Sequence, residues 1–290
     1  MKKNYVLTAV LLLASVLAFA QSEDDFTVHQ LPDNTLRISG YRGTVKDVVI
    51  PETIYGLQVT KIVDNDGLHD GLFDNKGLTS VVIPDTVTEI GFGAFQRNRL
   101  SSVVIGKSVK SIDRYAFAGN AELTEIVIPD SVTQMGDSVF QGCGLTSFTW
   151  GKELKAIPNS CFSGNKLSSL LDMPAWVTRI GSGAFSGNQM TSITIPSTVT
   201  FIGERAFQNN PVTEVVIPES LRAQRQIGEF AFSPRGTVSL TRITLPDNMP
   251  EGNVKNIVHY SDWEAFSNFW SSQNKAGGTY VKRGPIWTKE

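Results

Sequence analysis

The chain has 290 residues, of which 26 are lysine or arginine and 28 are aspartate or glutamate, and it contains two cysteines. A net charge of −2 provides no long-range attraction to nucleic acid or anionic lipid, and two cysteines are too few for a disulfide-stapled fold. A hydrophobic core, or a stack of repeated units, must therefore hold the chain together.

The first 20 residues have the pattern of a cleavable secretory signal. Lys2 and Lys3 precede a mostly apolar run over residues 5–17, and the AFA that follows places small residues at the −3 and −1 positions of a cleavage point. The run is shorter than the about 20 residues that a membrane-spanning helix needs, and no cysteine lies near the cleavage point to carry a lipid. We expect an exported chain that begins at Gln21, with no membrane insertion after signal cleavage.

Two series of residues repeat in phase along the rest of the chain. A strand-ending pair recurs at regular intervals, as at Ile83-Pro84 and Ile195-Pro196. A phenylalanine recurs in phase with it, at intervals of 22 or 23 residues and once of 25: Phe73, Phe95, Phe117, Phe140, Phe162, Phe185, Phe207 and Phe232. A fixed period of this size predicts a solenoid of stacked coils, whereas a globular sandwich of short strands predicts no fixed register.

One unit reads LTSVVIPDTVTEIGFGAFQRNR. Leu78, Val81 and Ile83 have the spacing of a strand with a buried inner face. The proline after Ile83 ends this strand because it has no N–H to donate. Val87 and Ile90 then point back inward, a glycine makes a turn, and Ala-Phe closes the coil. The pattern predicts one parallel strand in each coil.

The pattern LxxVxIPxxVxxIGxxAFxxN resembles the bacterial BspA-like, or treponemal-type, leucine-rich repeats. With the observed period, the resemblance implies a right-handed leucine-rich repeat solenoid of about nine 22–23-residue repeats over residues 45–246, with a parallel β-sheet on its concave face. It also implies a surface or secreted protein, since several members of the family are adhesins for host matrix proteins. That implication comes from the family and does not identify this chain's partner.

The two ends of the repeat array carry different patterns. Residues 21–44 contain two short alternating runs around LPDNT, which predict a β-hairpin that caps the first coil. Residues 247–290 contain SDWEAFSNFW, a helix with one apolar face, and GGTYVKRGPIW, a short strand; together they predict a C-terminal cap. A membrane-binding amphipathic helix is the alternative for this segment, although its polar face has few cations.

Insertions interrupt the repeat. The first, at residues 63–71, collects acidic residues and a histidine together with the Asp that follows it: Asp64, Asp66, His69, Asp70 and Asp74. Their spacing does not match a helix–loop–helix calcium loop, and Asp and Gly are ordinary turn residues. We therefore expect a turn without a metal site, and a metal-binding loop is the alternative.

Later insertions hold Arg222, Arg225 and Arg235, which form either a small basic edge or separate surface charges.

No catalytic constellation is present in the sequence. His29, His69 and His259 lie in three separate segments that no repeat brings together, and HExxH, GxSxG and paired CxxC motifs are missing. The glycines of GFGAFQ and GSGAFS follow from the repeat and need no phosphate-binding role. We therefore expect no catalytic residue, no cofactor and no enzymatic activity.

A column of outward-pointing side chains along the predicted strands is the candidate binding face. It lies between inward-facing residues, has low charge and is mostly β-branched: Val82, Val104, Val127, Thr149, Leu171, Thr194 and Val216. Such residues favour strands in any case, but a low-charge apolar surface on a solenoid is also typical of protein binding. Trp176 stands where other units have Thr, Ser or Glu, and we expect it to be an exposed anchor beside this column.

A second column predicts a buried polar ladder, because each member follows a repeat phenylalanine by three residues: Asn98, Asn120, Cys143, Asn165, Asn188 and Asn210. It resembles the ladder of leucine-rich solenoids, where a small polar group bonds the turns of its own and neighbouring coils. Cys143 fits because a thiol is small and tolerates burial. Cys161 falls in the alanine column, roughly 10 Å from Cys143 and beyond the ~7 Å limit for a disulfide.

Together these patterns predict an exported protein-binding scaffold that is a monomer and binds no nucleic acid. The first hypothesis is a cell-surface or secreted adhesion module that binds a protein through the concave sheet, either a host matrix protein or an envelope protein. The alternative is a periplasmic structural or assembly protein that holds other exported components together. Export supports both hypotheses equally.

Overall fold

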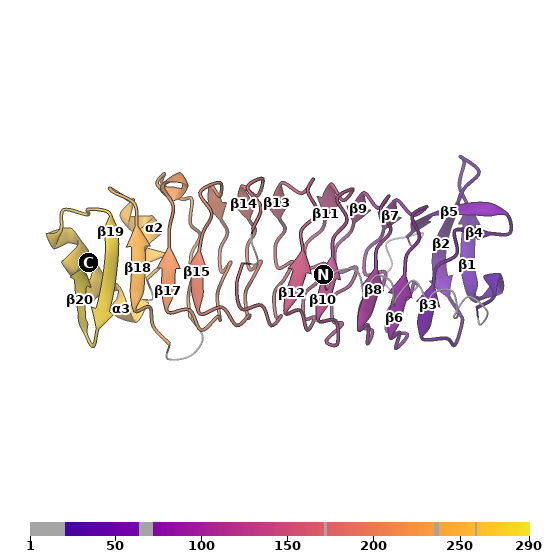
Figure 1. Ribbon diagram of the computed structural model, residues 1–290, viewed down its shortest axis with the longest axis horizontal. Helices are drawn as coiled ribbons and strands as arrows, with labels where there is room; N and C mark the ends of the chain where they lie inside the picture. The colour runs from indigo at the N-terminus through magenta and orange to yellow at the C-terminus, as the bar shows by residue number, and fades with distance from the viewer. Residues whose placement is uncertain (1–20, 64–71, 171–172, 235–237, 259) are drawn as a thin grey trace, which may run out of the picture. The chain divides into compact units, whose positions relative to one another are not determined.

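The computed structural model describes residues 21–63, 72–170, 173–234, 238–258 and 260–290 (Figure 1). The predicted signal segment 1–20, most of the first insertion with its acidic residues up to Asp70, Leu171, Arg235 and His259 lie outside the described residues. The chain divides into two compact units, which are described separately. Unit 1 comprises Met1–Met135 and Phe148–Glu153, and unit 2 comprises Gly136–Ser147 and Leu154–Glu290.

The coils of unit 1 contribute two short strands each, which build two separate ladders of parallel strands. The first ladder has three-residue strands: β3 (Asp47–Val49), β6 (Ser80–Val82) and β8 (Ser102–Val104) in one sheet, and β10 (Glu125–Val127) paired with β12 (Ser147–Thr149). The second ladder has two-residue strands: β7 (Glu89–Ile90), β9 (Ser111–Ile112) and β11 (Gln134–Met135).

The second ladder of unit 1 continues a sheet that begins at the N-terminal hairpin. After the 3-10 turn η1 (Glu23–Asp25), β1 (Phe26–Gln30) pairs antiparallel with β2 (Leu36–Tyr41), and β2 pairs parallel with β5 (Leu57–Ile62), which leads to β7; β4 (Thr53–Ile54) folds back on β5. The side-chain Oε1 of Gln21 accepts a hydrogen bond from the Val49 N–H of β3 at 2.8 Å. The predicted hairpin is therefore present, and Gln21 satisfies a backbone donor of the neighbouring ladder.

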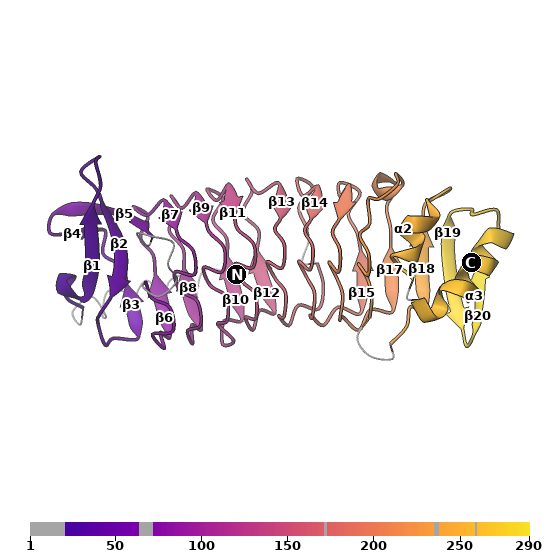
Figure 2. The ribbon, with the colours of Figure 1, turned by 180° about the vertical axis from the view of Figure 1, so that it is seen from behind.

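Unit 2 has the same two ladders. The second ladder consists of β13 (Ala156–Ile157), β14 (Arg179–Ile180) and β16 (Phe201–Ile202), and the first of β15 (Ser192–Thr194), β17 (Glu214–Val216) and β18 (Arg242–Leu245). After β18 the sheet turns antiparallel through β19 (Gly278–Arg283) and β20 (Ile286–Lys289). Two helices, α2 (Glu251–Lys255) and α3 (Tyr260–Ser272), and the 3-10 turn η2 (Glu219–Leu221) complete the unit (Figure 2).

The helix α3 packs on the C-terminal hairpin through aromatic rings. The ring of Phe266 lies edge-on to Trp287 at 4.8 Å and to Tyr280 at 5.6 Å, and all three side chains are buried. The sequence predicted one short strand after the helix, and two are present, because Gly284 adopts a positive φ of 63° and turns the chain back. The role of this segment as a cap stays a prediction.

The fold class is confirmed as a leucine-rich repeat solenoid with parallel strands, but the prediction of one strand per coil was wrong. The segment around Val87 and Ile90 was read as an inward-pointing turn, and its last two residues, Glu89 and Ile90, form β7. A two-residue strand has too few positions to show alternation in the sequence. It exists because neighbouring coils supply the backbone partners, as in the parallel pairing of β7 with β9.

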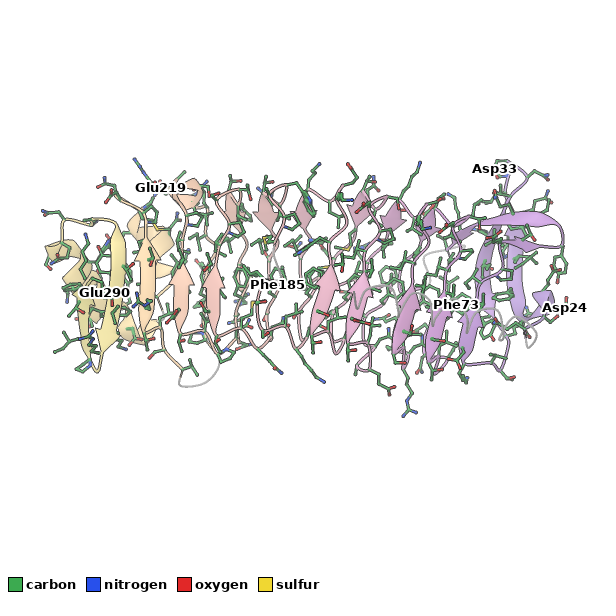
Figure 3. All side chains as sticks on the ribbon, viewed as in Figure 1. Asp24, Asp33, Phe73, Phe185, Glu219 and Glu290 are labelled. Carbon is green, nitrogen blue, oxygen red and sulfur yellow. The ribbon has the colours of Figure 1, made fainter. Side chains whose placement is uncertain are left out.

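The repeat phenylalanines form the centre of each unit and are fully buried. In unit 1 the rings of Phe73 and Phe95 stack at 4.9 Å, and Phe95 and Phe117 stack at 5.4 Å. In unit 2 the ring of Phe185 stacks on Phe162 at 5.6 Å and on Phe207 at 5.5 Å (Figure 3). Each coil therefore places one ring over the next, and the alanine column leaves room for the backbones to meet, as where Phe185 N–H donates to the Ala206 carbonyl at 2.8 Å.

The asparagine ladder connects successive coils through backbone groups. In unit 2, Asn188 Nδ2 donates to the carbonyls of Phe162 and Phe185, both at 2.9 Å, and its Oδ1 accepts the Leu167 N–H at 3.0 Å. The other four asparagines have equivalent partners in their own units: Asn98, Asn120, Asn165 and Asn210. One side chain thus satisfies three buried backbone groups that no strand or helix pairs.

The residue before each member of the alanine column has a left-handed backbone with positive φ, and we call this position the left-handed slot. In unit 2 it holds Ser160 at φ 53° and Gly183 at φ 62° in successive coils, and Arg205 at φ 56° in the next. A residue with a Cβ in this region costs about 1–2 kcal/mol relative to glycine. Gly183 therefore occupies the slot without strain, whereas Ser160 and Arg205 do not.

Removing the ladder amide should strongly destabilise unit 2. We expect Asn188→Ala to lower the free energy of unfolding by about 3 kcal/mol, because three buried backbone groups lose a partner. Urea denaturation followed by circular dichroism measures the effect. The adjacent exposed Gln189→Ala serves as the control, and an equal, small change in both variants would contradict the ladder's role.

The left-handed slot predicts opposite effects of two reciprocal substitutions. We expect Ser160→Gly to stabilise the protein by about 0.5–1 kcal/mol, since relief of strain exceeds the added freedom of the unfolded chain. Gly183→Ala should destabilise it by about 1 kcal/mol or more, because its Cβ would also approach Ser160 Oγ at 3.2 Å. Both values come from thermal or urea unfolding, and a loss of stability in both variants would show that the slot is not strained.

Candidate functional site

The candidate face in unit 1 lies on the outer side of the first ladder. Val82 and Val104 pair directly across β6 and β8 and are half-buried, whereas Val127 of β10 is 60% exposed and Thr149 of β12 is exposed. Val127 is the large apolar side chain of this face with the most exposed surface, and it occupies a strand position flanked by the exposed Glu125. A single exposed apolar side chain is ordinary on a protein surface, whereas a contiguous apolar row is typical of an interaction site. Val127 continues the low-charge row of Val82, Val104 and Thr149.

The same face in unit 2 is more polar. Thr194 is exposed and Val216 is half-buried, and the register continues to Thr244 of β18 and Thr279 of β19. The hydroxyls of Thr244 and Thr279 lie 3.0 Å apart and share a hydrogen bond. This row therefore offers β-branched methyl groups, and at its end the hydroxyls of Thr244 and Thr279 bond each other. Leu171, predicted to belong to the row, lies outside the described residues.

Trp176 lies in the two-residue turn after Pro174, the slot that the repeat assigns to it, and is half-buried. Thr86, Ser131 and Thr198 occupy the same slot in other coils and are also half-buried. Part of the indole is therefore exposed, and its role as an anchor stays a prediction.

Both cysteines lie buried in unit 2 as thiols that no disulfide joins. Cys143 is 4% exposed at the ladder position, and Cys161 is fully buried in the alanine column, where its carbonyl accepts the Phe140 N–H at 3.0 Å. Burial raises the pKa of the Cys161 thiol far above its usual range. A neutral, inaccessible thiol is a poor nucleophile, so neither the geometry nor the protonation state favours a reactive site.

Two findings on the described residues concern metal ligands and membrane-spanning helices. No group of three or more His, Cys, Asp or Glu side chains there could hold a metal ion. Asp74, predicted to lie with the first insertion's acidic group, pairs with Arg97. His29 is an exposed residue of β1. Among the described residues no helix has the length and apolar composition to cross a bilayer.

The second ladder of unit 2 carries features that the sequence reading missed. The guanidinium Cζ of Arg179 lies 4.1 Å from the ring centroid of Phe201 in the neighbouring strand. The turns of neighbouring coils are also joined by side-chain hydrogen bonds. Asp137 accepts the Asn159 N–H at 3.0 Å, and Asn159 Oδ1 accepts the Ser182 N–H at 2.8 Å. The sequence could have indicated this contact, because Arg179 and Phe201 are 22 residues apart and residues one full period apart lie side by side on neighbouring coils.

Comparisons with known proteins agree with the fold. Residues 59–169 and 157–267 match the family model described as the BspA type leucine-rich repeat region, with six copies. A crystal structure of a leucine-rich repeat protein from Bacteroides ovatus aligns over 78% of this chain with 25% identity and a TM-score of 0.57, and this chain covers 65% of that protein's length. This chain thus spans just under two thirds of that neighbour.

Two further structures align less closely. The leucine-rich repeat protein of Treponema pallidum matches 74% of this chain and 99% of its own length at 22% identity and a TM-score of 0.46. The pneumococcal vaccine antigen PcpA matches 77% of this chain and 69% of its own length at 18% identity and a TM-score of 0.49. No curated protein matches the sequence significantly.

Burial of Cys161 predicts a specific loss of stability at alkaline pH. The folded state holds the thiol neutral, so its stabilising effect is complete below the unfolded pKa and declines as pH rises above about 8.5, by about 1.4 kcal/mol per pH unit. We expect the wild-type protein to lose more stability between pH 7 and pH 10 than Cys161→Ala, which has the residue usual in this column. Urea midpoints that fall in parallel for both proteins would contradict this.

Proposed function

Because the chain belongs to the BspA-type leucine-rich repeat family, we propose that it is an exported scaffold whose function is to bind a protein. The family's fold supports an interaction module, since stacked coils present rigid, extended faces. The signal-like pattern of residues 1–20 supports export. The finer proposal is a cell-surface or secreted adhesion module that acts as a monomer, with no nucleic-acid ligand, no cofactor and no catalytic step.

The observation that carries the proposal is the exposure of Val127 in the first ladder of unit 1. Its side chain is 60% exposed in β10, and Thr149 and the half-buried Val82 and Val104 extend the same low-charge row. Burying a fully exposed valine against a partner contributes about 1.5–3 kcal/mol. We define Val82, Val104, Val127 and Thr149 as the first-ladder face and propose that it contacts the protein ligand.

Introducing charge at exposed positions tests this face without disturbing the core. We expect Val127→Lys with Thr149→Lys to reduce capture of the protein's ligand from host-matrix or envelope extracts at least tenfold, because two charges would be desolvated in the contact. Biolayer interferometry on the immobilised protein gives the capture level.

A matched control adds the same charge elsewhere on unit 1. Asp113→Asn with Gln134→Lys changes two exposed residues at the second ladder and should leave capture intact. Equal capture by both double variants would exclude the first-ladder face. Protease accessibility on intact cells then separates the adhesion module from the periplasmic assembly protein, because only a surface protein is cleaved before the envelope is opened.

A further inference from the structure

Arg179 and Phe201 form a cation–aromatic pair on the outer side of the second ladder of unit 2. They face each other across β14 and β16, and the next residues of these strands, Ile180 and Ile202, are fully buried. Because neighbouring strand residues point to opposite faces, Arg179 and Phe201 project away from the core. Arg179 is exposed and Phe201 is half-buried.

The stack holds the guanidinium in place. Its Cζ lies 4.1 Å from the Phe201 ring centroid, whereas the other cation–aromatic contacts among the described residues span 5.6–5.9 Å. A guanidinium that lies flat on a ring keeps its N–H groups at the edge, where they can form two parallel hydrogen bonds to a carboxylate. The side chain is therefore ordered before any ligand arrives, which lowers the entropic cost of binding.

Arg179 has no acidic partner of its own within the described part of unit 2. Two other arginines of this unit have such a partner: Arg205 pairs with Glu204, and Arg222 pairs with Glu219. Arg179 makes no ion pair or side-chain hydrogen bond to any described residue. Its N–H groups are thus ordered and exposed, and no described residue engages them through its side chain.

Exposed aromatic surface lies one coil further along. Phe230 is 49% exposed at φ 57°, in the left-handed slot, and Arg205 Cζ lies 5.6 Å from its ring. Arginine and aromatic side chains are enriched where protein partners bind most tightly. The carboxylates of Glu204, Glu219 and Glu229 on the same coils disfavour a dense polyanion, so the ligand should carry separate carboxylates next to apolar groups.

We propose that Arg179, Phe201, Arg205 and Phe230 bind a peptide segment of a protein partner in which a carboxylate side chain lies beside an aromatic one. The carboxylate pairs with the edge of the Arg179 guanidinium, and aromatic side chains of the segment pack on the exposed ring surface of Phe201 or, one coil further along, of Phe230. This surface is formed by the second ladder of unit 2 and the turns that follow its strands, and it does not depend on the first-ladder face of unit 1.

Fluorescence anisotropy with labelled peptides and the full chain tests the proposal. The probe has five repeats of Glu-Tyr-Gly-Ser, and the reference peptides replace its Glu by Gln or its Tyr by Ala. We expect the Glu-Tyr peptide to bind about tenfold more tightly than the Gln-Tyr peptide, as for one charge-assisted pair. Arg179→Gln should abolish that difference, and Phe201→Leu should reduce it by releasing the guanidinium.

Two controls make the outcome specific. Arg114→Gln removes another arginine that lies over an aromatic ring, that of Phe92 in unit 1. Val127→Lys with Thr149→Lys alters the first-ladder face. Both variants should bind the Glu-Tyr peptide as the wild type does. Unchanged binding by Arg179→Gln, or equal binding of the Glu and Gln peptides, would overturn the proposal. Arg179-dependent binding of heparin without binding of the peptide would also overturn it, in favour of a sulfated glycan.

Discussion

The buried backbone groups of the turns are the constraint on which each unit depends. Every coil brings carbonyl and N–H groups into the interior beside its phenylalanine, and a buried polar group without a partner costs free energy comparable to a lost hydrogen bond. A strand cannot pair them, because the chain must turn at this point to close the coil. The asparagine amide solves this locally, as where Asn210 bonds Phe185, Phe207 and Met190.

Much of this architecture was predictable because inward-facing residues recur at every coil. A column such as the phenylalanines has one environment repeated many times, so its chemistry is visible in the sequence. The position of Cys161 in the alanine column was readable for the same reason. The second ladder was not, since strands as short as Glu89–Ile90 owe their existence to backbone partners in neighbouring coils and not to their own side-chain pattern.

The outer surface was less predictable because its residues are not constrained to one environment. Trp176 aligned with small polar residues, and only the folded coil shows that the indole is half-buried. Val127 and Val104 occupy the same column, yet one is 60% exposed and the other half-buried, which depends on the side chains of adjacent coils. To predict the pairing of Arg179 with Phe201, the repeat period would have had to be combined with the outward direction of residues in the segment that the sequence analysis took for a turn.

The short reach of the ladder amides has a consequence for how such chains change length. Asn188 and Asn210 each bond backbone groups of their own coil and of the coil before it. Removing or duplicating one whole period therefore leaves every remaining ladder asparagine with equivalent backbone partners. An insertion or deletion of a few residues within a coil, in contrast, breaks the hydrogen bonds of one ladder asparagine. Gene duplication in steps of one period is therefore a low-cost route between short and long members of this family, and surface residues can diverge afterwards one coil at a time.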